Sequence, residues 1–302
     1  MDRGVWLIPV GVLALTALSL AQAPAAPPQN PSPGGWLVPD WNKPPITAAN
    51  RKPAPRRSLT GMWAPADGAG GGTQAQGIPL KPNNGKPENA LPYTPYGLEQ
   101  YKTHHALEGF DAVLPTEDND PRNRCEPLGV PRYNHYNVRL TQIFQDDYKV
   151  LMAYQYDNRW RVIWTDGRQL PKVVDGGVDV GGEIREPRFF GYSVGRWLDD
   201  YTFQAETVGT MPDDRVWLDS TGRPISEKVH VTETFRRLDA DTLVWSETID
   251  DPKIYMRPIE TMRMSMRLHD PRTDVQEYYC SPVEQENYNK LFGSGASIKG
   301  AP

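Results

Sequence analysis

The residues of this chain best suited to chemistry are two glutamates, Glu233 and Glu247, in the stretch from Ser226 to Pro258. Side chains alternate between the two faces of a β-strand, so residues two apart share a face. By this rule Glu233 shares a face with the apolar residues Val231 and Phe235. Two carboxylates on an inward face are costly unless a proton or an arginine lies between them, and such a pair could act as acid and base.

A β-hairpin must position these glutamates. Matching the apolar faces of its two arms requires an odd loop, Asp239 to Asp241, which places Glu233 opposite Glu247. Arg237 lies on the same face and is the expected partner of the pair. Two alternatives stay open: a purely structural Glu-Arg-Glu arrangement, and a register shifted by one residue that would place Ser246 opposite Glu233.

The other chemical motifs are weaker. The segment Gly191 to Gly195 (GYSVG) matches the nucleophile-elbow pattern around Ser193, which needs a turn between a strand and a helix. The residues that follow, Arg196 to Phe203, indicate strand and turn instead, and the two glycines more simply permit a bulge or a close strand crossing. None of the histidines has a spacing typical of a metal site. We therefore predict no metal and no cofactor.

Alternation of apolar and polar residues also predicts the other strands. They cover residues 138–144, 150–156 and 160–164, two strands between 189 and 208, the hairpin, and then 262–268 and 275–279. Thr94-Pro95 and the capping box from Ser281 to Glu284 predict the starts of two short flanking helices. Strands joined by short turns, each with one apolar face, must hide their edges. We expect an all-β fold: an antiparallel up-and-down meander of about eight to ten strands, closed into a lipocalin-like barrel.

The expected interior is rich in aromatic and methionine side chains. The inward set comprises Phe144, Tyr154, Trp160, Trp164, Phe235 and Trp245, with the row Met262, Met264 and Met266. A barrel of this size is either filled by side chains or holds one small ligand. We predict a small apolar or amphipathic ligand. The residues predicted to bind it are Tyr154, Trp160, Trp164, Phe235, Arg237, Trp245 and Met264.

Two other functions are compatible with the sequence. A buried carboxylate could make the chain an enzyme with acid-base or hydrolytic chemistry, at Glu233 with Glu247 and less well at Ser193. Alternatively, exposed aromatic residues such as Trp217 could form a patch that binds an envelope protein or a glycan. We favour a binding protein over an enzyme.

The N-terminus predicts export. Residues 1–21 combine a short charged start, an apolar run and small residues at the end, as in a secretory signal peptide. A Pro-rich disordered linker is expected at 22–57, a barrel domain at 58–292 with a Gly/Pro-rich insertion at 64–92, and a disordered tail at 293–302. The segment from Ser58 to Trp63 (SLTGMW) predicts a short strand that docks on that domain, with Trp63 as its anchor. The mature chain would be periplasmic or secreted, with no stable membrane insertion.

Cys125 and Cys280 are the only cysteines of the chain. An even count in an exported protein indicates a disulfide. Because Cys125 precedes the first strand of the meander and Cys280 ends the last, this bond would hold those two strands together. The formal net charge of -5 is spread without a basic stripe, so we expect no nucleic-acid partner.

Three sequence blocks carry a resemblance to known proteins: Cys125 to Arg132 (CEPLGVPR), Thr165 to Arg168 (TDGR) and the hairpin from Ser226 to Pro252. With them, residues 58–280 resemble a large family of exported, functionally uncharacterised bacterial proteins. The resemblance implies secretion and a β-rich fold. In the pattern of that family the position of Glu247 is usually apolar, so the resemblance supports Glu233 more than Glu247. Gly61-Met62-Trp63 is also similar to the G-x-W start of lipocalin-like barrels.

Overall fold

The structure is a computed structural model that describes residues 43–66, 80–81, 91–109, 111–115, 117–135, 140–212, 214–261, 263–288 and 290–291. These residues belong to one compact unit, Leu37–Pro302. The predicted signal peptide, residues 22–42 of the predicted linker, most of the insertion and the predicted tail lie outside the described residues.

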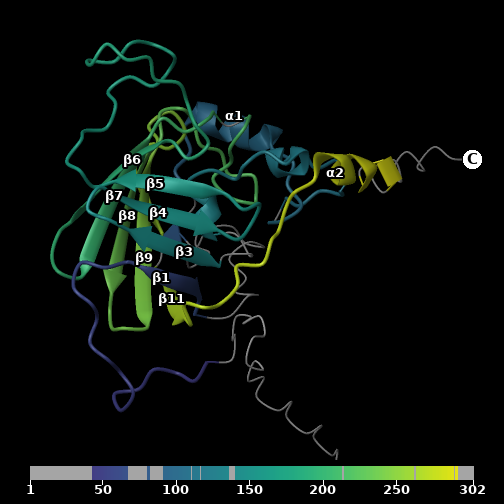
Figure 1. Cartoon of the computed structure of the whole chain (residues 1–302). Helices are drawn as coiled ribbons and strands as arrows, with labels where there is room; N and C mark the ends of the chain where they lie inside the picture. The colour runs from purple at the N-terminus through teal and green to yellow at the C-terminus, as the bar shows by residue number, and fades with distance from the viewer. Residues whose placement is uncertain are drawn as a thin grey trace, which may run out of the picture. The chain divides into compact units, whose positions relative to one another are not determined.

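Nine strands of the described residues close into a barrel (Figure 1). Around the wall they are β1 (Gly61–Pro65), β3 (Thr141–Gln145), β4 (Lys149–Tyr154), β5 (Trp160–Trp164), β6 (Tyr192–Trp197), β7 (Thr202–Val208), β8 (His230–Arg237), β9 (Thr242–Asp250) and β11 (Met264–His269). Beyond β9 the sheet continues through β10 (Ile259–Thr261) and β2 (Leu80–Lys81). The predicted all-β barrel is confirmed.

One pair of neighbouring strands is parallel, which corrects the purely antiparallel meander. Strands β5 and β6 pair only at Ile163 with Ser193 and at Trp164 with Val194. Parallel neighbours need a long crossover. Residues 165–191 supply it, and Figure 1 shows this connection standing out from the wall near β6. These two residue pairs lie at the end of β5, so the first half of β5 has no pairing with β6.

Strand β1 closes the barrel. Met62 lies opposite His269 of β11 on one side and opposite Gln142 of β3 on the other. Trp63 points inward and is fully buried, and its Nε1 donates to the carbonyl of Leu59 at 2.8 Å. The docked strand predicted at Gly61-Met62-Trp63 is therefore a full member of the wall.

The predicted disulfide forms, but it does not hold the first and last strands of the barrel together. The Cα atoms of Cys125 and Cys280 lie 5.4 Å apart across the bond. Cys125 follows the 3-10 helix η2 (Pro121–Arg124), and Cys280 follows β11 by a long segment. Residues 275–279, predicted as the last strand, contribute only one bridge, between Tyr156 and Tyr278. The bond instead fastens the C-terminal segment to the end of η2. The barrel is closed by β1.

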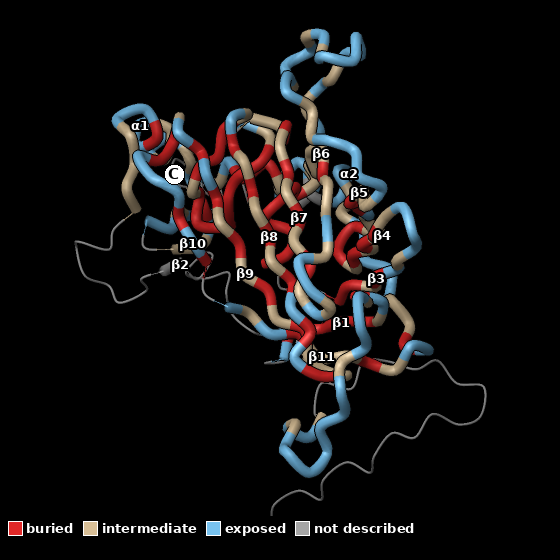
Figure 2. Tube along the Cα trace, turned by 90° about the vertical axis from the view of Figure 1, so that its left-hand side faces the viewer, coloured by how far each residue is buried: buried red, intermediate tan, exposed pale blue. Residues whose placement is uncertain are grey.

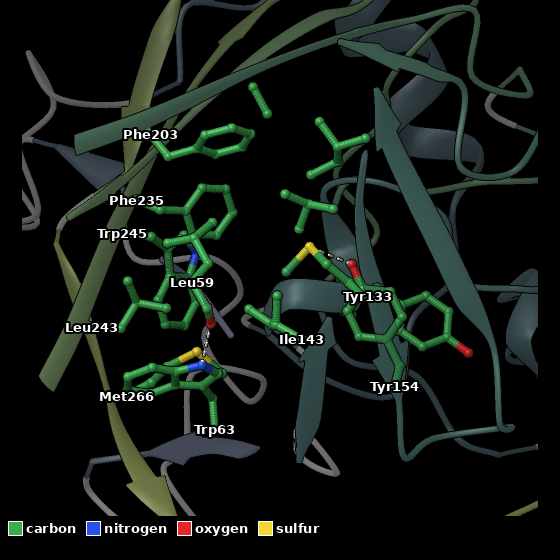
Figure 3. Packing of buried hydrophobic residues seen from close by; sticks show 14 of the residues in the cluster. Leu59, Trp63, Tyr133, Ile143, Tyr154, Phe203, Phe235, Leu243, Trp245 and Met266 are labelled. Carbon is green, nitrogen blue, oxygen red and sulfur yellow. Dashed lines mark hydrogen bonds between the residues drawn. The ribbon is translucent and has the colours of Figure 1, made fainter. Parts of the chain in front are cut away.

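Two apolar clusters lie in the barrel. Along β7, β8 and β9, buried residues alternate with partly exposed ones, as the colours of Figure 2 show. In the cluster near the β8–β9 turn, the rings of Phe203, Phe235 and Trp245 face side chains from β3, β4 and the 3-10 helix η3 (Arg132–His135), as Figure 3 shows. The cluster toward the other end contains Val231 of β8 and Ile249 of β9. Packed side chains thus occupy the interior in which a ligand was expected.

In two strands, β5 and β3, the face that points inward is the opposite of the predicted one. On β5, Trp160 is 64% exposed, while Arg161 and Ile163 are buried. On β3, Phe144 is 52% exposed and Ile143 is buried. Alternation cannot separate the faces of β5 because both carry apolar residues, the outer ones lying beside the 165–191 connection. The predicted inward faces of β4, β8 and β9 are confirmed.

Both predicted helix starts are confirmed. Helix α1 (Pro95–Thr103) begins after Thr94, whose Oγ1 accepts a hydrogen bond from the backbone N–H of Gly97 at 2.9 Å. Helix α2 (Pro282–Tyr288) begins after Ser281. None of the helices in the described ranges has the length and apolar character that crossing a membrane requires.

Candidate functional site

A polar layer lies inside the barrel between the two apolar clusters. Along β8, Glu233 lies between Phe235 of one cluster and Val231 of the other. Glu247 of β9 lies directly opposite Glu233, in the register that the odd loop predicts. The register shifted by one residue is wrong. Both carboxylates are buried, with 0% and 2% of their surface exposed, so they need partners inside the protein.

Arg161 of β5 is the counter-charge of Glu233. Its Nη1 donates to Oε1 of Glu233 at 2.9 Å, and its Nη2 donates to Oε2. The same guanidinium donates to Oγ1 of Thr207 at 2.7 Å and to Oγ of Ser193 at 3.1 Å. Burial opposes its charge, but the charge and hydrogen bonds of Glu233 outweigh burial, so the pKa of Arg161 lies above its usual range. Arg161 therefore stays charged inside the barrel.

Asn134 joins the two carboxylates. Its Nδ2 donates to Oε1 of Glu233 and to Oε1 of Glu247, both at 2.8 Å. The hydroxyl of Tyr154 donates to Oδ1 of Asn134 at 3.3 Å. Burial raises the pKa of Tyr154 to about 12, so this hydroxyl remains a neutral donor. A primary amide has two N–H donors, and here each of them holds one carboxylate.

His135 completes the layer at Glu247. Its Nε2 lies 2.6 Å from Oε2 of Glu247. This contact gives the buried carboxylate of Glu247 a second partner beside Asn134. A buried carboxylate needs such partners because it has lost its hydration.

The 3-10 helix η3 delivers Asn134 and His135 to this layer. At its start, Arg132 makes a two-point ion pair with Asp120, with contacts of 2.8 Å and 2.5 Å. The hydroxyl of Tyr133 donates to a backbone carbonyl just after β4 at 2.7 Å. Every residue of η3 is buried. The amide and the imidazole therefore come from a short element that Arg132 and Tyr133 hold in place.

Arg237 is not the partner of the carboxylates, which corrects the prediction. Its guanidinium donates to the carbonyls of Ser58 at 3.2 Å and Ala240 at 2.6 Å, and lies 4.6 Å from the centre of the Trp63 ring. These contacts hold the Arg237 side chain beside the β8–β9 turn. Arg237 shares the inward face of Glu233, but the turn carbonyls at its own end of the strand satisfy it.

Ser193 lies within a strand, not at a nucleophile elbow. It is buried in β6, and its Oγ lies 2.9 Å from Oγ1 of Thr207. Gly191 has φ +59°, which favours glycine, and a Cβ on Gly195 would lie 2.3 Å from Cζ of Phe203. The glycines thus permit a bend and a close approach, as the simpler interpretation predicted.

A lateral pocket of about 780 Å³ lies beside β5 and β6. Its aromatic lining comprises Trp160, Trp164, Phe189, Phe190 and Tyr192. Its basic lining comprises Arg159, Arg161, Arg168, Arg185 and Arg188. Arg161 and Ser193 belong both to this lining and to the polar layer, so the pocket lies against the part of the wall that carries the layer. Both residues are buried.

The predicted ligand residues fall into two groups. Trp160 and Trp164 line the lateral pocket. The remaining apolar ones, Tyr154, Phe235, Trp245 and Met264, belong to the apolar cluster near the β8–β9 turn or pack against it, and they do not line the pocket. The structure therefore separates the two tryptophans of β5 from the residues predicted to share a site with them.

Trp217 does not belong to an exposed patch. It is buried and stacks on His104, with ring centres 4.3 Å apart. Burial lowers the pKa of His104 to about 4, so this imidazole is neutral near neutral pH. Over the described ranges, no three or more His, Cys, Asp or Glu side chains are grouped so that they could hold a metal ion.

Sequence reasoning missed four residues of the polar layer: Asn134, His135, Arg161 and Thr207. One signal could have revealed Arg161. A pair of opposed inward carboxylates needs a cation from another inward face. Arg161 is the one charged residue of β5, whose other residues are apolar. The sequence around Asn134 and His135 carries no such pattern, because η3 is a short turn and the carboxylates that these two side chains contact lie 99 to 113 residues further along the chain.

Comparison with known protein families, curated proteins and solved structures finds no match to this chain. The resemblance to exported bacterial proteins therefore stays a prediction. Function must be inferred from the polar layer and the lateral pocket.

Proposed function

We propose that this chain is an extracytoplasmic β-barrel protein that binds a small amphipathic molecule in the lateral pocket. The pocket itself is the observation that carries the proposal: about 780 Å³, with five aromatic side chains in its lining. Small-molecule sites typically have volumes of about 300 to 1,000 Å³ and aromatic walls with a few polar groups. The barrel interior already holds two apolar clusters and a polar layer in which every carboxylate oxygen has a hydrogen-bond partner, which favours the lateral site.

The aromatic side chains of the pocket offer apolar surface to a ligand. Trp160, the first residue of β5, is 64% exposed and lines the pocket. Covering such a ring removes apolar surface from water, which is worth about 25 cal/mol per Å². Arg168 lies over the ring of Trp164, with its guanidinium carbon 3.6 Å from the ring centre. A flat ligand that covers Trp160 would extend this stacked surface into the pocket.

Acid-base catalysis at Glu233 has weaker support. Both of its oxygens accept hydrogen bonds from Arg161 or Asn134, and the carboxylate is fully buried. A general base must come within hydrogen-bond reach of the proton that it removes. Neither Glu233 nor Glu247 lines the lateral pocket, so a ligand there would not reach either carboxylate.

Two observations support a location outside the cytoplasm. Residues 1–21 have the pattern of a secretory signal peptide, and Cys125 is bonded to Cys280, as is usual in oxidising compartments. Mass spectrometry of the protein from expressing cells should give a chain that begins at Gln22. A cytoplasmic chain that retains residues 1–21 would contradict the location.

The binding proposal is tested with N-phenylnaphthylamine, a neutral amphipathic probe whose fluorescence rises in apolar sites. We expect saturable binding to the purified protein, and Trp160→Ala should weaken it about fivefold because the probe loses its apolar contact. Phe144→Ala is the matched control, since Phe144 is an exposed aromatic residue outside the pocket. If Trp160→Ala and Phe144→Ala bind the probe as the unchanged protein does, the pocket is not the binding site.

A further inference from the structure

We infer that the ligand of the lateral pocket carries an acidic group, such as a carboxylate, sulfonate or phosphate, and that Arg188 binds this group beside the aromatic wall. The inference rests on the proposed function and narrows it to anionic amphipathic molecules. Three observations carry it: the charge of the lining, the pairing of its arginines and the position of Arg188.

The lining of the pocket is strongly basic although the chain is acidic. The formal net charge of the whole chain is -5. The pocket lining nevertheless includes five arginines and no aspartate or glutamate. Arginines concentrated in one concave site with low-dielectric walls attract anions more strongly than the same charges on an open surface. The lining itself thus presents guanidinium groups and no carboxylate, although the chain as a whole is acidic.

Four of these arginines already have a carboxylate partner outside the lining. The pairs are Arg159 with Asp157, Arg161 with Glu233, Arg168 with Asp166, and Arg185 with Asp179 and Glu183. Their charges are compensated, so they shape the pocket more than they bind in it. Within the described ranges, Arg188 is the lining arginine that has no carboxylate within ion-pair distance.

Arg188 is held in place through its backbone and its guanidinium plane. Its backbone N–H donates to the carbonyl of Gly209 at 3.0 Å, and its carbonyl accepts from the N–H of Met211 at 3.1 Å. Its guanidinium carbon lies 4.2 Å from the centre of the Tyr192 ring. A guanidinium stacked by its face can still use the N–H donors at its edge for a two-point contact with a carboxylate or phosphate. Arg188 is therefore positioned to receive the acidic group of a ligand whose apolar part lies against Trp160.

The test compares two probes with the same aromatic body. Anilinonaphthalene sulfonate carries one sulfonate, and N-phenylnaphthylamine lacks it. We expect the sulfonate probe to bind about tenfold more tightly, since a hydrogen bond to a charged group typically adds this much. Arg188→Gln should remove most of that difference and leave the affinity for the neutral probe within about twofold. Arg236→Gln is the matched control, because Arg236 is an exposed arginine of β8 that does not line the pocket.

The outcomes separate this inference from the proposal beneath it. If both probes bind equally, if Trp160→Ala weakens both and if Arg188→Gln changes neither, the pocket binds ligands but not through an acidic group. If Trp160→Ala affects neither probe, the pocket is not the binding site and both proposals fail. A melting curve for each variant confirms that the protein is folded before binding is compared.

Discussion

Each oxygen of the buried carboxylates Glu233 and Glu247 accepts a hydrogen bond from a side chain that is itself buried. The donors are a guanidinium, an amide and an imidazole, and they come from β5 and η3. Such a network is stable as a whole and sensitive to the loss of one member, because the remaining charge cannot reach water. The polar layer should therefore contribute to stability and to a unique arrangement of η3 in the barrel.

Replacing Glu233 by glutamine tests this. Glu233→Gln leaves the buried charge of Arg161 without its carboxylate, so we expect the free energy of unfolding to fall by about 3 to 5 kcal/mol in urea denaturation. Glu206→Gln provides the control. Glu206 lies on the outer face of β7 and pairs with Arg196, so its loss should cost less than about 1 kcal/mol. Equal costs for the two variants would contradict the proposed importance of the layer.

The opposed glutamates could be predicted because a hairpin is local. Alternation fixes the faces of its arms, and the loop length fixes the register. Arg161 could not be found in this way. Its neighbours Trp160 and Trp164 are larger and more apolar, so alternation placed them inside. The outer face of β5 is apolar as well because it lies beside the crossover at 165–191. The pattern within β5 alone does not show that this crossover lies there.

Among the elements, β6 contributes both to the packed interior, through Gly195, and to the lining of the lateral pocket, through Tyr192. Gly195 faces inward on this strand, and a Cβ there would lie 2.3 Å from the ring of Phe203 and 2.9 Å from Cγ2 of Ile163. The absence of a side chain lets the ring cross the strand closely. Gly191, just before β6, has a φ of 59° that favours glycine, so the chain can turn into the strand there.

Gly195→Ala should destabilise the protein by about 1 to 3 kcal/mol, because the added methyl group overpacks the core against an aromatic ring. The exposed neighbour Arg196→Ala should change stability by less than about 1 kcal/mol. Thermal unfolding followed by circular dichroism measures both. A Gly195→Ala variant as stable as the unchanged protein would show that the ring moves aside freely.

Most strands of the barrel wall were predictable, but the parallel pairing of β5 with β6 and the closure through β1 were not. The wall strands between Lys149 and His269 have local patterns, and short turns imply antiparallel neighbours. The connection at 165–191 has no helix to signal a parallel crossover, although parallel strands are usually joined by one. Residues 275–279 alternate like a strand, yet they make one bridge because β1 already occupies the place beside β11 and β3.

For the molecule as a whole, the packed interior and the lateral pocket differ in how far the sequence predicts them. The first is built from hairpin neighbours, which the sequence pattern reveals. The second combines Arg159 and Arg161 of the β4–β5 region with Arg168, Arg185 and Arg188 of the crossover, and these are too far apart along the chain to suggest a basic site. A net charge of -5 conceals such a local concentration of arginines.

The central claim is that ligands bind beside β5 and β6 and not in the barrel interior. A crystal structure of the protein with anilinonaphthalene sulfonate tests it most directly. We expect the probe to cover Trp160, with its sulfonate at the guanidinium of Arg188 and the apolar clusters unchanged. A probe bound among Phe235, Trp245 and Met264 would contradict the claim and restore the barrel interior as the binding site.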